Sequence, residues 1–217
     1  MRIFRYTDER GRPNLGNVAG DYGPPKEKRN MEPIRIAGIS GSIRKASFST
    51  SLLRTLATRI APAIELEVVT LENIPLYNED LDRDPEIPAV ANLKRVIAES
   101  DGVVIATPEY NHGVPGVLKN ALDWASRPVF KSCFVGKPVS IISSSLAFTG
   151  GVRAQYQLRE TLISMQAHLV VGPEVVVAGV HTKMTEDAYQ DEKGLEFMVD
   201  SLNRLGEEIL SCRLVRA

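Results

Sequence analysis

Five short apolar runs, separated by longer amphipathic stretches, constrain the fold of this chain more than any other feature. The clearest run is GVVIAT at 102–107, which is apolar at nearly every position. Such a run is typical of a central parallel strand that is covered on both faces. The other runs lie at 34–40, 64–71, 137–144 and 170–179. Strands that alternate with helices predict an α/β fold with a five-stranded parallel sheet and right-handed crossovers.

Helical periodicity fills the intervals between these strands. We expect helices up to about residue 60, over 89–100, 117–126 and 152–167, and from about 187 to 212. The first two helices have apolar residues at helical spacing, which should pack on the sheet. These residues are Leu52, Leu53, Leu56 and Ile60 in the first, and Val90, Leu93, Val96 and Ile97 in the second.

Residues 1–33 differ in composition from everything after them. They are rich in Gly, Pro, Asn and charged residues and have no sustained apolar period, which predicts a flexible N-terminal extension. This extension could dock on a neighbour. Alternatively, the extension could come from a start assigned too early, because Met31 stands just before the first strand. We expect residues 34–217 to form one domain, which is long enough to bury a substantial core.

Charge and hydropathy limit the expected partners and location of the chain. A formal net charge of −1 gives no reason to expect nucleic acid or an anionic membrane as a partner. No apolar run approaches the roughly 18 residues of a spanning helix. No secretory signal is visible, and acidic residues among the early arginines argue against a transit peptide. Cys133 and Cys212 lie far apart and fit no metal spacing. We therefore expect a soluble cytoplasmic protein without a metal site.

The loops after the first, third and fourth strands are the most unusual stretches of the sequence. In an open parallel sheet, ligands bind beyond the carboxyl ends of the strands, where the strand order reverses. The two observations together place the candidate site at these three loops.

The first of these loops, 40–50, predicts a phosphate site. It has five hydroxyl side chains at a helix N-terminus, where the macrodipole favours an anion. Arg44 can add a charged contact to phosphate oxygens. The alternative is plain N-capping by Ser47 or Ser49, but one cap needs only one hydroxyl. Because GxGxxG and the P-loop pattern are absent, a terminal monophosphate such as that of FMN fits better than a dinucleotide.

The other two loops suit a planar heteroaromatic ring. Loop 108–116 combines an aromatic residue, an amide and a Gly-x-Pro-Gly turn, which offer flat surfaces and backbone groups for a polar edge. Loop 143–151 ends in Gly150 and Gly151, which allow the backbone to approach a ligand closely. An ordinary turn and a flexible capping loop are the respective alternatives.

Three sequence blocks resemble the NADPH-dependent FMN reductase family, with the bacterial quinone and chromate reductases as nearest members. They are GSIRKASFS, PEYNHGVPGVLKNALDWASRP and SSSLAFTGGVRAQYQLR, in matching order across about 34–210. PEYN followed by VPGxLKNAxDW is the most specific of these patterns. The resemblance implies a flavodoxin-like three-layer sandwich, non-covalent FMN, and NADPH or NADH as a transient electron donor. It also implies a homodimer or homotetramer with active sites near the subunit boundaries.

The resemblance further implies which residues would contact the cofactor. Those around the FMN phosphate would be Ser40, Ser42, Arg44, Ser47 and Ser49. Those beside the ribityl chain and the isoalloxazine would be Pro108, Glu109, Tyr110, Asn111, His112, Gly113, Ser144, Ser145, Leu146, Ala147, Gly150 and Gly151. Tyr77 belongs to a loop that lies near the cofactor entrance in the family, and would face the substrate.

Three positions depart from the family's pattern. Ser49 stands where relatives often have Asn, and its shorter side chain could leave one phosphate contact to water. His112 replaces the usual Tyr or Asn after PEYN, which could alter the ring environment. Ala147 replaces a Gly that is common in the family, and Ala would be strained there if this residue has a positive φ.

The resemblance implies reduction of small acceptors, namely quinones, azo compounds, chromate or free flavin. The flavin carries the hydride chemistry, so we assign no catalytic side chain. NAD(P)H and the acceptor would bind in turn, in a ping-pong cycle. A non-enzymatic electron carrier or redox-responsive module is the alternative. The near-neutral charge disfavours it, because carrier flavodoxins tend to be acidic. A scaffold that has lost FMN is a third possibility.

Other conspicuous residues have structural explanations. Trp124 falls on the apolar face of its helix and is expected in the core. Lys119 and Asp123, four residues apart, should form a surface pair. We expect His168 at a helix end and His181 in a loop, neither with neighbours of metal-ligand type.

Overall fold

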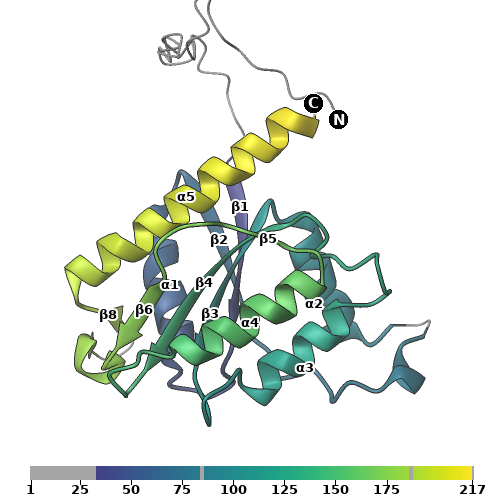
Figure 1. The fold of residues 1–217 in the computed structure, drawn as a ribbon, viewed down its shortest axis with the longest axis horizontal. Helices are drawn as coiled ribbons and strands as arrows, with labels where there is room; N and C mark the ends of the chain where they lie inside the picture. The colour runs from purple at the N-terminus through teal and green to yellow at the C-terminus, as the bar shows by residue number, and fades with distance from the viewer. Residues whose placement is uncertain (1–32, 84–85, 186–187, 217) are drawn as a thin grey trace, which may run out of the picture. The chain divides into compact units, whose positions relative to one another are not determined.

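A parallel sheet forms the centre of the computed structural model, which describes residues 33–83, 86–185 and 188–216 (Figure 1). Its strands are β1 (Ile34–Ser40), β2 (Ile64–Val69), β3 (Gly102–Pro108), β4 (Pro138–Ser145), β5 (His168–Leu169) and β6 (Val175–Ala178). The strand order is β2-β1-β3-β4-β5, and β6 also pairs with β4. The predicted α/β fold with a five-stranded parallel sheet is therefore confirmed, in the flavodoxin-like order. The predicted extension lies outside the described residues except for Pro33.

The fifth strand is divided, where the sequence predicted one run over 170–179. β5 pairs with the start of β4 at Pro138 and Val139, whereas β6 pairs with its end from Ile142 onward. The segment between the two pieces contains Gly172 and Pro173. Proline has no N–H to donate to a ladder, which explains the interruption.

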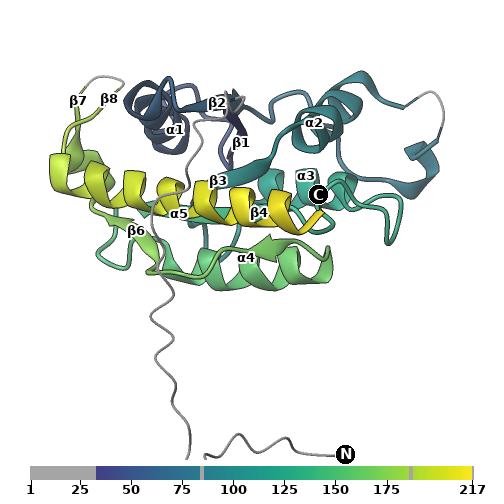
Figure 2. The same ribbon diagram turned by 90° about the horizontal axis from the view of Figure 1, so that it is seen from above.

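Within the described residues, five helices cover the sheet. They are α1 (Phe48–Ile60), α2 (Pro88–Glu99), α3 (Gly116–Ala125), α4 (Val152–Ser164) and α5 (Glu192–Arg216). Helices α2, α3 and α4 pack in one apolar cluster, and α1 and α5 pack in the other. Figure 2 shows α1 and α2 on opposite sides of β1 and β2. The predicted apolar faces of α1 and α2 are confirmed, since all eight residues are buried.

Short elements precede α5 and correct its predicted start near residue 187. A 3-10 turn η2 (Val180–Lys183) is followed by the antiparallel pair β7 (Met184–Thr185) and β8 (Ala188–Tyr189). Asp191 then accepts a hydrogen bond from the Gly194 amide at 3.2 Å, which satisfies one of the free N–H groups of the first turn of α5. Another 3-10 turn, η1 (Glu79–Leu81), lies between β2 and α2. None of the helices in the described ranges is long and apolar enough to cross a membrane.

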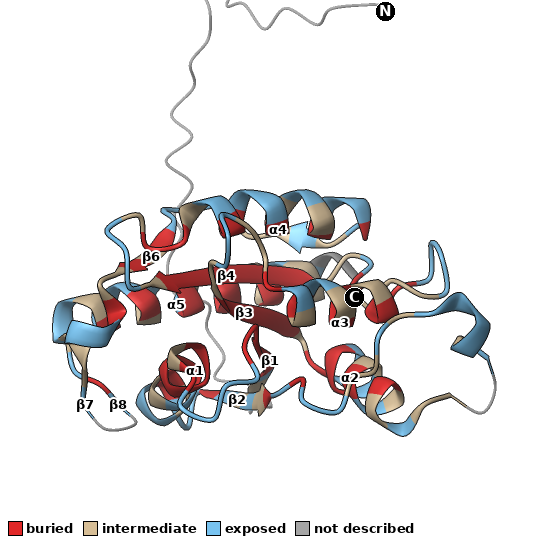
Figure 3. Cartoon of the chain, turned by 90° about the horizontal axis from the view of Figure 1, so that it is seen from below, coloured by how far each residue is buried: buried red, intermediate tan, exposed pale blue. Residues whose placement is uncertain are grey.

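The central strands are buried along their length, as Figure 3 shows for β3 and β4. This burial confirms the reading of 102–107 as a strand covered on both faces. The register places Ser40 beside Ala106, and Pro108 beside Ser144. The loops after β1, β3 and β4 therefore leave the same edge of the sheet next to one another. The first and second leave on either side of the point where the strand order reverses.

Candidate functional site

A cavity of about 650 Å³ lies at the carboxyl ends of β1, β3 and β4. This volume is in the range of small-molecule sites. Eleven of the seventeen residues predicted to contact a cofactor line the cavity. They are Ser42, Arg44, Ser47, Ser49, Pro108, Glu109, Tyr110, Ser144, Ser145, Leu146 and Ala147. The other six, Ser40, Asn111, His112, Gly113, Gly150 and Gly151, do not line it.

The first loop forms the N-terminus of α1. Ser47 is the N-cap, and its hydroxyl accepts a hydrogen bond from the Thr50 amide at 3.3 Å. Ser40 donates to the Ser42 carbonyl oxygen at 3.3 Å and shares a 2.8 Å hydrogen bond with the Thr50 hydroxyl. N-capping is thus correct for Ser47, while Ser40 shapes the loop behind the cavity wall.

Ser49 has a different environment. Its side chain lines the cavity, yet the residue is only 1% exposed. Its hydroxyl oxygen has no hydrogen-bond partner among the described residues. A buried polar group without a partner costs about 1–3 kcal/mol, so such groups need an explanation. At a helix N-terminus, an anionic oxygen in the cavity would supply the missing partner.

Arg44 and Phe48 form one wall of the same region. The Arg44 guanidinium carbon lies 5.0 Å from the centre of the Phe48 ring, a cation–π distance. The Arg44 amide donates to the Ser42 hydroxyl at 3.4 Å, which fixes the backbone of the loop. Arg44 thus brings a positive charge to the same cavity that Ser49 lines.

The second loop closes as a tight hairpin. Tyr110 and Gly113 exchange backbone hydrogen bonds of 3.1 and 3.0 Å. Between them, Asn111 has φ 48° and His112 has φ 66°. Two consecutive positive φ angles are the signature of a type I′ turn, which Asn tolerates well. The two residues at the tip of this turn do not line the cavity, whereas Pro108, Glu109 and Tyr110 do.

Glu109 connects this loop to α4. Its side chain is 8% exposed, and one carboxylate oxygen accepts from the amides of Arg153 at 2.9 Å and Ala154 at 3.2 Å. The Arg153 guanidinium lies 3.7 Å from the other oxygen. A second link joins the Gln157 side-chain oxygen to the Val114 amide at 2.6 Å. The Glu109 carboxylate is thus occupied by the α4 N-terminus, a favourable place for negative charge.

The glycines of the third loop shape it from outside the cavity. Gly150 and Gly151 have φ angles of 59° and 89°, which residues with a Cβ atom rarely adopt. A Cβ on Gly151 would lie 3.1 Å from the Ser143 Cβ, so the backbones pack closely here. Ala147 is not among the described residues with positive φ. The strain considered for alanine at this position is therefore absent.

Sequence reasoning missed three residues of the cavity, namely Phe48, Val180 and His181. Val180 and His181 belong to η2, after the last strand of the sheet. The Gly179 amide donates to the Ala147 carbonyl oxygen at 3.4 Å, which holds this turn against the third loop. The sequence could have indicated Val180 and His181, because the loop after the last parallel strand leaves the same edge of the sheet as the other three loops.

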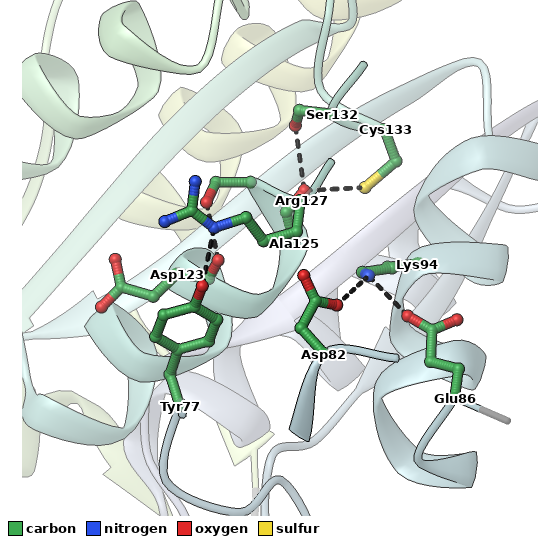
Figure 4. Close-up of polar contacts among 10 residues, drawn as sticks. Tyr77, Asp82, Glu86, Lys94, Asp123, Ala125, Arg127, Ser132 and Cys133 are labelled. Atoms are coloured by element: carbon green, nitrogen blue, oxygen red, sulfur yellow. Dashed lines mark hydrogen bonds and ion pairs between the residues drawn. The ribbon is translucent and has the colours of Figure 1, made fainter. Parts of the chain in front are cut away.

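Tyr77 does not line this cavity. Its hydroxyl accepts from the Arg127 Nε at 2.8 Å, as Figure 4 shows. Its ring meets that of Trp124 edge-on, with the centroids 5.0 Å apart. Trp124 is 1% exposed and donates to the Pro75 carbonyl oxygen at 2.9 Å, so the predicted core position is confirmed. A substrate-facing role for Tyr77 remains a prediction that these contacts do not support.

Other expectations are resolved in the same way. Lys119 and Asp123 form the expected ion pair, at 2.6 Å. Burial raises the pKa of the Cys133 thiol to about 11, which keeps it protonated at neutral pH. His168 lies on β5 instead of at a helix end, because α4 ends at Ser164. The expectation that it lacks metal-ligand neighbours is wrong, as described below.

Comparison with known proteins decides the family. The family model of the NADPH-dependent FMN reductases matches residues 34–182. This chain belongs to the NADPH-dependent FMN reductase family. It is 37% identical to an NAD(P)H-dependent FMN reductase of Pseudomonas aeruginosa over 175 residues, 80% of this chain and 94% of that protein. It is 39% identical to a quinone reductase of Escherichia coli K12 over 183 residues, 82% of this chain and 96% of that protein.

A solved structure supports the same assignment. The flavoenzyme NAD(P)H:(acceptor) oxidoreductase FerB from Paracoccus denitrificans matches with a TM-score of 0.72 and 31% identity, covering 82% of this chain and 98% of FerB. The resemblance drawn from the three sequence blocks is therefore confirmed. As a member of the NADPH-dependent FMN reductase family, the chain is an enzyme of the NAD(P)H-dependent flavin and quinone reductase group.

Proposed function

We propose that this enzyme holds FMN in the cavity at the carboxyl ends of β1, β3 and β4 and reduces small acceptors with NAD(P)H. The observation that carries the proposal is the buried hydroxyl of Ser49 at the N-terminus of α1, which has no hydrogen-bond partner within the described ranges. A phosphate oxygen there would complete its hydrogen bonding, beside the positive charge of Arg44. The residues present thus fit the phosphate end of FMN, with Ser42 and Ser47 as further hydroxyls.

The rest of the cavity suits a flat ring system with a polar edge. Tyr110 and Leu146 offer apolar surface, and the backbones of 108–110 and 144–147 offer hydrogen-bonding groups. When bound, FMN supplies the hydride chemistry between NAD(P)H and the acceptor. The protein's contribution is to bind and orient. Glu109 does so indirectly, since its hydrogen bonds to α4 fix the wall of the cavity.

Among quinones, azo compounds, chromate and free flavin, quinones are the acceptors that this cavity favours. Phe48, Leu146 and Val180 make part of its wall apolar, which suits a planar quinone better than a chromate anion. Azo compounds share the planar apolar character of quinones. The names of the relatives from Pseudomonas aeruginosa and Escherichia coli accord with flavin and quinone substrates.

A homodimer or homotetramer with the cavity near a subunit boundary is part of this proposal. Several large apolar side chains at or near the cavity are exposed in the single chain. Tyr110 is 50% exposed, Leu146 61% and Phe148 91%. Exposed apolar groups of this size mark interaction surfaces when they gather. Light scattering after size-exclusion chromatography should give a mass of two or four chains, and a monomer would contradict this part of the proposal.

Steady-state kinetics test the reaction order. With the FMN-loaded enzyme, the concentrations of NADPH and a benzoquinone are varied against each other. The donor and acceptor use one cavity in turn, so the double-reciprocal lines should be parallel. Intersecting lines would show that both substrates bind together and would overturn the ping-pong cycle. No NADPH oxidation with any quinone would contradict the proposed acceptor class.

A further inference from the structure

We propose that His168, Glu208 and Cys212 form a binding site for a zinc-like divalent cation, on the side of the domain formed by β5 and α5. These three residues play no part in the cavity described above. One ligand atom from each, an imidazole nitrogen, a carboxylate oxygen and the thiol sulfur, all lie within 4.8 Å of one another. The chain has only three His and two Cys. A histidine and a cysteine that both lie close to one carboxylate are therefore a specific arrangement.

The distances are close to those that a tetrahedral site requires. Zinc binds nitrogen and oxygen at about 2.0–2.1 Å and sulfur at about 2.3 Å, which places the ligand atoms roughly 3.3–3.5 Å apart. The Nε2 of His168 lies 3.1 Å from the Oε1 of Glu208. The sulfur needs to move by no more than about 1–1.5 Å to reach the same spacing. Rotation about the side-chain bonds of a half-exposed cysteine covers this range.

The backbone beneath the three residues is well anchored. Glu208 and Cys212 are four residues apart on α5, so they share one face of that helix. Ile209, between them, is 2% exposed and packs in the core. His168 pairs with Pro138 of β4, and its amide donates to the Lys137 carbonyl oxygen at 2.9 Å. The site therefore combines side chains from two elements that the fold already holds together.

The nearby cations already have partners. Arg213 follows Cys212 and lies 2.7 Å from the Asp101 carboxylate. Lys137 donates to the carbonyl oxygens of Ala98 at 3.1 Å and Ser100 at 2.5 Å. Among the described residues, the Glu208 carboxylate forms an ion pair with His168. The carboxylate is thus oriented toward the imidazole that would share the ion with it.

The chemistry of the donor set selects the cation. A thiolate and an imidazole favour zinc and similar transition metals over calcium or magnesium, which prefer oxygen ligands. Three protein ligands leave a fourth position for water. A bound ion would join the carboxyl-terminal part of α5 to β5, so the expected role is stabilisation of this part of the domain. The cation site does not depend on FMN.

Zinc binding to the full-length, metal-stripped, reduced protein tests the proposal. Isothermal titration with Zn²⁺ should give one ion per chain. The dissociation constant should rise roughly tenfold or more in Cys212→Ser and in Glu208→Gln, since even partners outside the ligand shell contribute 10–100-fold. Glu207→Gln is the matched control, because Glu207 is an exposed neighbour of the same chemistry and is not in the cluster. Its affinity should equal that of the unmodified protein.

Cobalt gives an independent readout of the ligands. Co²⁺ bound in place of zinc should show a thiolate charge-transfer band, which Cys212→Ser should abolish and Cys133→Ser should retain. If the protein does not bind one equivalent of Zn²⁺ per chain, the proposal is overturned, and His168 and Glu208 form only an ion pair. Binding that Cys212→Ser and Glu208→Gln leave unchanged would also overturn it, because the ion would then lie elsewhere.

Discussion

Ser49→Ala should affect the free protein and the FMN complex in opposite directions. Without FMN, the buried Ser49 hydroxyl has no hydrogen-bond partner in the described part of the chain and carries a desolvation cost of about 1–3 kcal/mol. Alanine removes that cost and is also the better helix former by a few tenths of a kcal/mol. The FMN-free variant should therefore be more stable than the unmodified protein, by about 1 kcal/mol or more.

The same substitution should weaken FMN binding. A hydrogen bond to a charged group contributes about 1.5–3 kcal/mol, so the loss corresponds to roughly ten- to hundredfold in the dissociation constant. Urea unfolding of the FMN-free protein and quenching of FMN fluorescence measure the two effects separately. Ser51→Ala makes the same change in α1 at a buried residue that does not line the cavity, and it should leave FMN affinity unchanged. A Ser49→Ala protein that is less stable without FMN, and binds FMN equally well, would refute the reasoning.

Three further substitutions probe two supports of the site and one carboxylate at the opposite end of β3. Glu109→Ala should lower the free energy of unfolding by about 1–3 kcal/mol in urea, because two α4 amides lose their acceptor, and Glu109→Gln should recover part of this loss. An equal loss for both variants would assign the effect to the charge alone. Gly151→Ala should cost about 1–3 kcal/mol and weaken FMN binding, since φ is 89° and the added Cβ meets Ser143; unchanged unfolding would contradict this. Burial opposes the ionisation of Asp101, but hydrogen bonds from Arg213 and the Arg35 amide outweigh it and lower the pKa of Asp101. A lowered pKa gives stability that is present above the unfolded value of about 3.9 and is lost as pH falls through the folded value. Asp101→Asn should therefore lower the Tm at pH 7 and approach the unmodified protein in acid, and a constant difference across pH would contradict this.

The fold was predictable because most of its determinants are local. Apolar runs such as 102–107 and the apolar face of α2 depend on periodicity alone, and both occur as expected. The division of the fifth strand was less accessible. Gly172 and Pro173 signal an interruption, but their consequence depends on which residues of β4 remain available for pairing.

The site was predictable at the level of loops and less so at the level of side chains. The loop proposed to hold phosphate was singled out by its hydroxyls, yet which hydroxyl caps the helix and which stays without a partner in the described part of the chain depends on packing. Ser47 takes the first role and Ser49 the second. Glu109 could not be assigned to α4 from the sequence, because the N-terminus of that helix reaches it only in the folded chain. His181 and its turn enter the cavity from beyond the last strand for the same reason.

The visible absorption spectrum of the purified protein with added FMN, followed by anaerobic NADPH, tests the central claim most directly. A perturbed flavin spectrum that stays with the protein through gel filtration and bleaches with NADPH is the predicted result. A flavin that binds but does not bleach would contradict the reductase activity. A protein that takes up no FMN would contradict the assignment of the cavity itself.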